Sequence, residues 1–233
     1  NAGDITKGGR CDGSEEKPYE ISCIEDLVVL SNMTNGKGIK LENGKAVTIT
    51  SKNVFTNKYI ILTKNLNFKS KYSYNDSTRT DFGNLNNDDT DGNSLITEMT
   101  TGTGFIPIAD YAGNFDGREH TIANIYINAL EGDKTSKALI KNATKNASIM
   151  NLCVTGTVKS EWQAAGIVAY GVNNGEIKII NCINKANITG KNMVGGIAAS
   201  YMKIIENCTN YGNVEITGSE YRICWYWGNN RSR

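Results

Sequence analysis

The chain has 233 residues, with 25 Lys and Arg against 24 Asp and Glu, so its formal net charge is close to zero. This balance gives no electrostatic reason to expect nucleic acid or an anionic membrane as a partner. Charged residues make up 21% and hydrophobic residues 39% of the chain, which excludes a disordered-type composition. No apolar run is long enough for a membrane span. A single histidine argues against His-based metal sites and most His-dependent catalysis.

Turn-forming residues dominate the composition: the chain contains 24 Gly, 30 Asn and only 2 Pro. Gly and Asn accept left-handed backbone conformations that β-branched residues avoid. Ile, Val and Thr are frequent between these turns, which favours strands. The composition therefore predicts an all-β chain that turns often and without proline.

The N-terminal region predicts an irregular lead-in over residues 1–20 and then a short helix at about 22–33. Ser22 is suited to be the N-cap, and Glu25 three residues later completes a capping box. Apolar residues at helical spacing follow. A lone helix before a long β region is expected to cover one end of a stack of sheets.

Short apolar segments recur between turn residues after the helix and predict strands at Ala46–Ile49, Tyr59–Leu62, Leu66–Phe68 and Thr121–Ile127. Residues 70–104, rich in Ser, Thr, Asn and Asp, interrupt the pattern and are interpreted as a polar excursion. Residues 21–233 are expected to form one domain.

Clear internal repeats occupy about residues 149–224. The Asn-Cys element at Cys182 returns 26 residues later at Cys208, and a degenerate copy at Cys153 lies 29 residues upstream of Cys182. Gly-Ile elements at Gly166 and Gly196 lie between these copies. A period near 26 residues without intervening helices predicts a solenoid, because one repeat cannot bury its apolar face alone.

Stacking successive turns about 4.8 Å apart would place equivalent side chains in columns. Cys182 and Cys208 are then interpreted as small hydrophobes of one inward column, and Asn residues at matching offsets are expected to stack at corners. A disulfide between the two neighbouring turns is an alternative. Cys11 and Cys23, which lie outside the repeat, could pair with each other.

The segment from Gly113 to Ile122 resembles the Phe-x-Gly-x-Phe-Asp-Gly-x-Gly-His-Thr-Ile signature of the Gly-Leu-Xaa-Gly (GLUG)-type repeat proteins of bacterial surfaces. The Gly-Gly-Ile and Asn-Cys-x-Asn elements resemble the repeats that follow that signature. The chain departs from it at Arg118-Glu119, where Asn-Gly is commoner, and at Tyr221-Arg222, where Gly-Gly is expected. The resemblance implies a right-handed parallel β-helix on a secreted or wall-attached protein, of which this chain is a piece. It implies no single activity.

An acidic segment within the polar excursion matches the spacing of a calcium-binding loop. Asn87, Asp89, Asp91, Gly92 and Glu98 supply oxygen ligands and a sharp turn at the intervals that Ca²⁺ loops use. No helix is predicted before it, so the segment is not expected to be an EF-hand. The alternative is a solvated polar loop.

Aromatic residues crowd near the C-terminus and form a second candidate site, at Tyr221, Arg222, Trp225, Tyr226 and Trp227. Exposed aromatic side chains serve as platforms for sugar rings and as hot spots of protein interfaces. The alternative is that they cover the end of the stack or pack on a following repeat.

Three further residues carry weaker signals. Trp162 is expected at a turn, where it is a lesser ligand candidate. His120 could be a catalytic base, but a corner hydrogen bond within the Phe-Asp-Gly turn is the preferred interpretation. Asp116 is expected to form that turn.

The leading hypothesis is a non-enzymatic, monomeric recognition module outside the bacterial cell, binding a host protein, such as an immunoglobulin or mucin-type glycoprotein, or a glycan. No cofactor is expected beyond possible Ca²⁺, and no nucleic acid or membrane insertion. A passive stalk is the first alternative. A polysaccharide lyase or hydrolase is the second, and it would need clustered acids or a calcium site with a nearby base.

Overall fold

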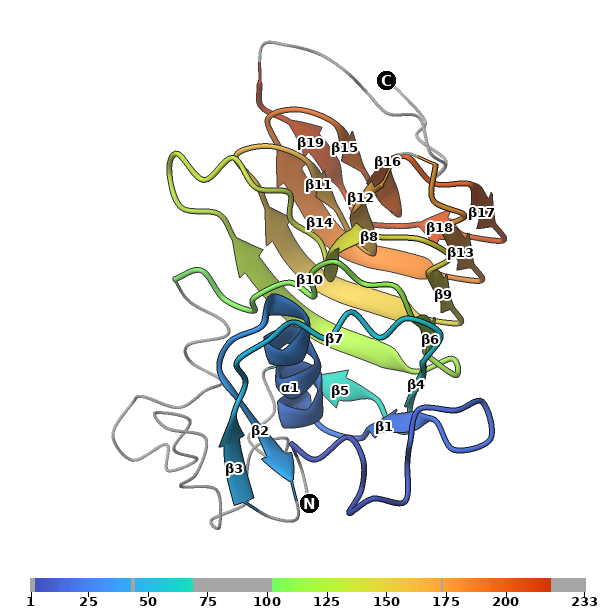
Figure 1. The fold of residues 1–233 in the computed structure, drawn as a ribbon. Helices are drawn as coiled ribbons and strands as arrows, with labels where there is room; N and C mark the ends of the chain where they lie inside the picture. The colour runs from blue at the N-terminus through green and yellow to red at the C-terminus, as the bar shows by residue number, and fades with distance from the viewer. Residues whose placement is uncertain (1–2, 43–44, 69–101, 173, 219–233) are drawn as a thin grey trace.

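The computed structural model describes residues 3–42, 45–68, 102–172 and 174–218. Its parallel strands stack into a β-solenoid of about three turns, with one short α-helix at the N-terminal end (Figure 1). The predicted fold class, a parallel β-helix with an N-terminal capping helix, is therefore confirmed.

The helix α1 spans Ile24–Asn35, and its start corrects the predicted capping box. The N-cap is Cys23, whose side chain makes no capping hydrogen bond. The Ser22 hydroxyl donates instead to Asp26 Oδ2 at 2.9 Å, and the Ser22 backbone N–H donates to the same oxygen at 2.8 Å. Asp26 therefore links the entering chain to the first helical turn.

The helix ends at a glycine that takes the left-handed backbone needed there. Gly36 has φ +71°, and its N–H donates to the Met33 carbonyl at 3.3 Å. The N–H of Lys37 donates to the Asn32 carbonyl at 3.2 Å, which completes a Schellman motif.

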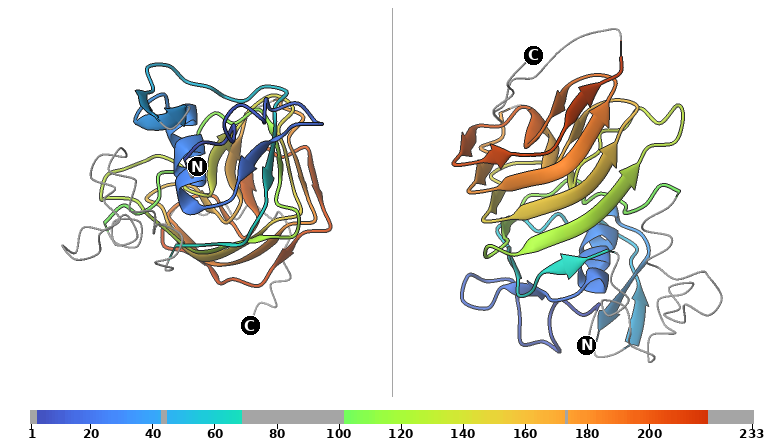
Figure 2. Two further views of the ribbon diagram at one scale, coloured as in Figure 1. Left: turned by 90° about the horizontal axis from the view of Figure 1, so that it is seen from below. Right: turned by 180° about the vertical axis from the view of Figure 1, so that it is seen from behind.

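Three parallel sheets form the walls of the solenoid, and the end-on view shows their circuits superposed around one axis (Figure 2). The strands of the first sheet, in spatial order, are β1 (Tyr19–Ile21), β4 (Tyr59–Leu62), β6 (Asn114–Asp116), β9 (Ser148–Met150), β13 (Lys178–Ile180) and β17 (Ile204–Glu206).

The second sheet is built from the longest strands. Its members are β5 (Leu66–Asn67), β7 (Thr121–Asn128), β10 (Cys153–Lys159), β14 (Ile183–Gly190) and, both paired with β14, β18 (Thr209–Asn210) and β19 (Val214–Ile216). The strands predicted at Tyr59–Leu62, Leu66–Phe68 and Thr121–Ile127 are thus confirmed within one residue.

The third sheet is shorter and is completed by a corner pair. Its strands are β8 (Ile140–Ala143), β12 (Val168–Gly171) and β16 (Ala198–Ser200), beside the pair β11 (Ala164–Ala165) and β15 (Val194–Gly195). The strand predicted at Ala46–Ile49 lies outside the solenoid, because β2 (Ile39–Glu42) and β3 (Lys45–Thr48) form an antiparallel hairpin.

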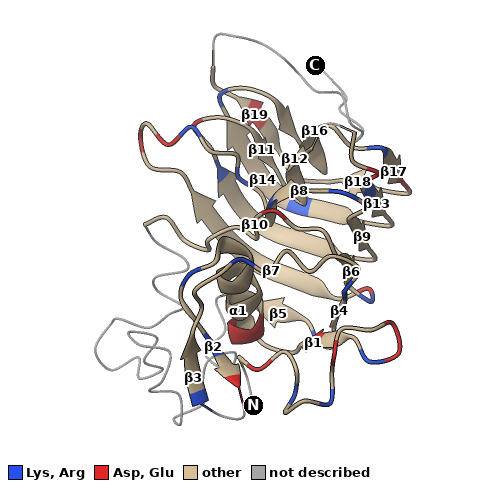
Figure 3. Cartoon of the chain, viewed as in Figure 1, with Lys and Arg blue, Asp and Glu red and all other residues tan. Residues whose placement is uncertain are grey.

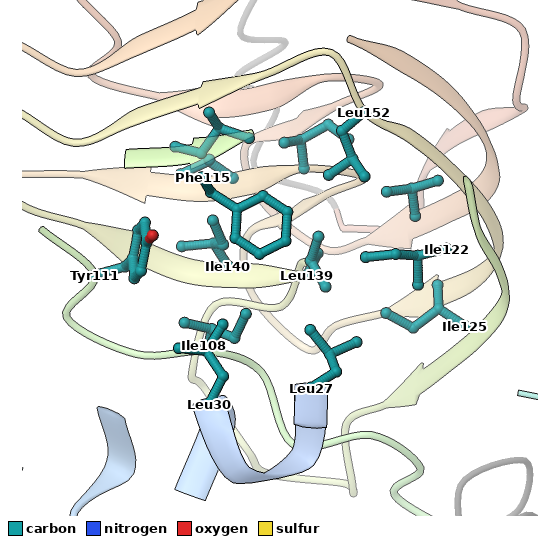
Figure 4. Packing of buried hydrophobic residues seen from close by; sticks show 14 of the residues in the cluster. Leu27, Leu30, Ile108, Tyr111, Phe115, Ile122, Ile125, Leu139, Ile140 and Leu152 are labelled. Atoms are coloured by element: carbon teal, nitrogen blue, oxygen red, sulfur yellow. The ribbon is translucent and has the colours of Figure 1, made fainter. Parts of the chain in front are cut away.

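Apolar side chains in register fill the interior of the stack. One column of the first sheet runs through Phe115, Ile149 and Ile179, none of which is exposed to solvent. Leu27 and Leu30 of α1 face this interior from the N-terminal end (Figure 4). The helix therefore covers apolar surface that the first circuit would otherwise expose.

The cysteine column confirms one part of the predicted register and corrects another. Ile183 pairs with Thr209, which places Cys182 opposite Cys208 as predicted. Cys153, however, pairs with Ile183. The buried Leu152 therefore occupies the column position that the internal repeats predicted for Cys153. The true offset between these circuits is 30 residues, and a slip of one residue exchanges the inward and outward faces of a strand.

The five described cysteines are free thiols, so neither the Cys11–Cys23 nor the Cys182–Cys208 disulfide forms in this structure. The Cys182 backbone N–H donates to Cys208 Sγ at 3.4 Å. The hydrogen bond with Cys208 and burial raise the pKa of the Cys182 thiol, which keeps it neutral as a small core residue.

Asparagines stack at one corner of the solenoid, as predicted. Asn151, Asn181 and Asn207 have φ values of +53°, +53° and +52°. Asn181 Nδ2 donates to Asn151 Oδ1 at 3.1 Å across two circuits. Asn tolerates left-handed backbone, and its amide also joins neighbouring turns, which explains its frequency in this chain.

A second asparagine pair lies inside the stack and explains the Gly-Ile elements. Asn184 is fully buried, and its Nδ2 donates to Asn210 Oδ1 at 2.7 Å. A Cβ atom at Gly166 would lie 2.3 Å from Asn184 Oδ1, and one at Gly196 would lie 2.3 Å from Asn210 Cγ. Glycine is required at both positions because the asparagine side chains occupy the space of a methyl group.

Candidate functional site

Both candidate sites predicted from the sequence lie outside the described residues. These are the calcium-loop residues Asn87, Asp89, Asp91, Gly92 and Glu98, and the aromatic cluster Tyr221, Arg222, Trp225, Tyr226 and Trp227. The polar excursion predicted over residues 70–104 also lies outside them except for residues 102–104.

The Phe-Asp-Gly turn has the structural role predicted for it. His120 Nδ1 lies 3.3 Å from Asn65 Oδ1, which belongs to the preceding circuit. Asp116 Oδ1 accepts the Arg118 N–H at 2.8 Å and the Asn151 amide at 2.9 Å. These groups hold a corner of the stack through ordinary hydrogen bonds.

The candidate site that the structure reveals is an open depression of about 410 Å³ beside the third sheet. We call it the Trp162 depression. Its lining comes from several separate segments and consists of Lys52, Asp110, Lys134, Thr135, Ser136, Lys141, Asn142, Trp162, Gln163 and Tyr170.

One wall of the depression is a loop that is longer than the corresponding loop of the next circuit. Asn128 pairs with Lys159, and Lys137 pairs with Ala164, so residues 129–136 replace the four residues 160–163 of the next circuit. The four additional residues make this loop project beyond the stack (Figure 1). The depression therefore lies beside a loop that is four residues longer than its counterpart in the next circuit.

Backbone hydrogen bonds fix the position of Trp162. Its N–H donates to Ser160 Oγ at 3.0 Å, and its carbonyl accepts the N–H groups of Lys191 and Asn192 at 3.1 Å each. Trp162 is nevertheless 38% exposed, so part of this large aromatic residue is accessible to a ligand. The prediction that Trp162 lies at a turn is confirmed, because it stands in a bend before β11.

A second aromatic ring joins the lining from β12. The rings of Tyr170 and Tyr201 pack edge to face, with centroids 5.6 Å apart. This contact holds Tyr170 in one orientation at the same depression as Trp162.

The lining contains one carboxylate, that of Asp110, and it forms an ion pair and a hydrogen bond with neighbouring side chains. Lys52 Nζ lies 2.6 Å from Asp110 Oδ2, and the Asn142 amide donates to Asp110 Oδ1. Hydrogen bonds from Lys52 and Asn142, and the charges of Lys52 and Lys141, lower the pKa of the Asp110 carboxyl. Asp110 is therefore ionised at neutral pH, and its φ of +49° shows that the surrounding contacts hold an unfavourable backbone.

Elsewhere the charges of both signs lie mainly on loops and turns (Figure 3). Within the described residues, no group of three or more His, Cys, Asp or Glu side chains could hold a metal ion. No helix among those residues is long and apolar enough to cross a membrane.

Sequence reasoning reached only one member of this site, Trp162, and ranked it below the C-terminal aromatics. Residues as far apart as Lys52 and Tyr170 meet here only because the circuits stack. The one local signal is the polar segment around Lys134, whose composition is like that of the chain's other turns.

Comparisons of this chain with protein-family models, with curated proteins and with solved structures found no match.

Proposed function

We propose that this chain is a non-enzymatic recognition module of a secreted or surface-attached bacterial protein, binding a host glycoprotein or a glycan in the Trp162 depression. The observation that carries the proposal is an open depression of about 410 Å³ that combines two aromatic rings with amide, hydroxyl and ammonium groups. That volume is in the range of small-molecule binding sites. Aromatic faces pack against sugar rings, and the polar groups around them can hold sugar hydroxyls.

The scaffold supports recognition because hydrogen bonds fix the backbone at both aromatic residues. Trp162 is anchored by three backbone hydrogen bonds, and Tyr170 belongs to a strand paired on both sides. A fixed backbone at these two residues lowers the cost of ordering the site when a ligand binds. The location outside a bacterial cell is part of the proposal and is supported by the resemblance of Gly113–Ile122 to the GLUG-type surface repeats.

The composition of the depression favours binding over catalysis. Glycoside hydrolysis uses two carboxyl groups, one on each side of the scissile bond. The lining contains Asp110 alone, and that carboxylate is already engaged by Lys52 and Asn142. We therefore propose a binding site rather than a hydrolytic one.

The test is a glycan array probed with the labelled chain and with two single variants. Trp162→Ala should weaken binding by about 30-fold, because an aromatic hot spot contributes about 2 kcal/mol. Tyr211→Ala is the matched control, since Tyr211 is 70% exposed and does not line the depression. This control should bind as the unmodified chain does.

A chain that binds no glycan or glycoprotein on the array would contradict the proposal and favour the passive stalk. Equal loss of binding in the Trp162 and Tyr211 variants would place recognition elsewhere on the surface. Thermal melting of both variants checks that each is folded.

A further inference from the structure

We infer that the Trp162 depression selects an anionic glycan, one in which a carboxylate or sulfate group accompanies the sugar ring. This inference rests on the proposed function and narrows its ligand class. It depends on how the lysines of the depression are partnered, compared with those next to it.

Three lysines and one carboxylate line the depression, which leaves a net charge of +2. Lys52 is neutralised by Asp110, at 2.6 Å. Among the described residues, neither Lys134 nor Lys141 has an ion-pair partner. Two ammonium groups are therefore available to a ligand.

Two lysines next to lining residues, Lys137 and Lys191, differ because each has an acidic partner. Lys137 Nζ lies 2.7 Å from Asp133 Oδ2, and Lys191 pairs with Glu161. Partial burial acts to raise the pKa of Asp133, but hydrogen bonds from Lys137 and Thr135 lower it to about 2, so this pair stays charged at neutral pH. Lys134 and Lys141 thus differ from these paired neighbours in having no acidic partner, and both lie in the lining beside the aromatic rings.

Neutral polar groups also line the depression, and their oxygen atoms have second lone pairs that can accept from sugar hydroxyls. The Asn142 amide donates to Asp110, the Gln163 amide donates to Met193 Sδ at 3.8 Å, and the Ser136 hydroxyl donates to Gln163 Oε1 at 3.0 Å. The whole chain carries a formal charge of only +1, which is not the continuous basic surface that nucleic acids require. A sugar ring against Trp162 with its anionic group at Lys134 and Lys141 would use each feature.

The experiment compares anionic oligosaccharides with their neutral parents on one array, followed by titration calorimetry of the best binder. Sialylated oligosaccharides supply a carboxylate, sulfated ones supply a sulfate ester, and the desialylated and desulfated parents supply neither. Binding should be confined to one or both anionic groups and should weaken as salt is raised. The comparison between the sialylated and sulfated arms identifies which anion is preferred.

The double variant Lys134→Ala/Lys141→Ala should lose at least about tenfold in affinity, as expected when charge-assisted hydrogen bonds are removed. The matched control Lys178→Ala/Lys185→Ala removes two exposed lysines on other sheets and should bind normally. Its melting temperature and that of the double variant confirm folding.

Each remaining outcome separates the two proposals. Neutral parents that bind as well as the anionic glycans, with loss in Trp162→Ala, would overturn the anionic selection while the recognition site stands. Full affinity in the Lys134/Lys141 double variant would also overturn it. An array without any signal would remove the proposed function itself.

Discussion

At the scale of single residues, two positions where the chain departs from the GLUG-type signature have an unfavourable backbone conformation. Arg118 and Glu119 have φ values of +46° and +63°, in the left-handed region where Asn and Gly are the usual residues. The signature has Asn-Gly there more often, for the same conformational reason. This chain keeps the turn with two less suitable residues, while Gly117 is kept because a Cβ would lie 2.4 Å from the Asn151 carbonyl oxygen.

Replacing Glu119 with glycine should therefore stabilise the protein. Relief of the left-handed conformation gains about 1–2 kcal/mol, and the greater freedom of glycine in the unfolded chain offsets part of it, leaving roughly 0.5–1 kcal/mol. Urea denaturation measures the difference. The control Glu206→Gly, in the extended strand β17, should be destabilising, and a destabilised Glu119→Gly protein would contradict this reasoning.

Residue-level register was predictable from the sequence only where the repeats are regular. The pairing of Cys182 with Cys208 followed directly from identical Asn-Cys elements. The Cys153 copy failed because matching by residue type placed one cysteine on another, whereas burial selects Leu152 for the inward column. Chemical likeness in a short motif does not specify which face of a strand a residue occupies.

At the scale of elements, the N-terminal helix is joined to the lead-in by a buried charge. Asp26 is fully buried, and Lys7 Nζ lies 2.7 Å from its Oδ2. Its Oδ1 accepts the Gly3 N–H at 2.6 Å. The sequence predicted an irregular lead-in. The structure shows that Lys7 of this lead-in neutralises the Asp26 carboxylate in the first turn of the helix.

Asp26→Asn should cost about 3 kcal/mol, because the Lys7 ammonium would remain buried without its counter-charge. The exposed pair of Lys40 and Glu42 is the control, and Glu42→Gln should change stability by less than about 0.5 kcal/mol. Urea unfolding curves give both values. Similar small costs for the two variants would mean that the Lys7–Asp26 pair contributes no more than a surface pair.

The helix itself was predictable in existence but not at its boundaries. Apolar periodicity indicated a helix at about 22–33, and the structure has it at Ile24–Asn35. The start moved because Ser22 uses its hydroxyl on Asp26, and the end is fixed by Gly36. Competing side-chain hydrogen bonds of this kind are not visible from spacing alone.

At the scale of the whole molecule, the two ends of the stack differ in burial. The N-terminal end is covered by α1, whereas Ile205, Cys208, Val214 and Ile216 of the last described circuit are only partly buried. Within the described residues, β17 and β19 each pair along one edge. Stability in a solenoid is carried by contacts between neighbouring circuits, so the last circuit should open first.

Hydrogen exchange should show this gradient. Backbone amides of β17 and β19 should exchange at least about tenfold faster than those of β9 and β10, because local openings need less free energy at a poorly buried edge. Mass spectrometry of peptic fragments resolves these strands. Uniform protection across all circuits would indicate one cooperative unit in place of the predicted gradient.

The fold could be predicted from the sequence because the same short motifs recur in successive circuits of a solenoid. Each further copy strengthens the prediction. The Trp162 depression was not readable, because it arises where residues 129–136 break the repeat and meet side chains from distant circuits. Recurring motifs therefore predict the solenoid, whereas the candidate site depends on a segment that does not follow the repeat.

The direction of strand pairing has a consequence for how the protein is made. From β6 onward, each strand of the first sheet joins the edge of one already synthesised, 55, 34, 30 and then 26 residues earlier by the pairs Ile60–Phe115, Phe115–Ile149, Ile149–Ile179 and Ile179–Ile205. A nascent chain emerging from the ribosome can therefore add circuits in order, each using the previous one as a template. The helix, completed early, would shield the starting end from association with other nascent chains.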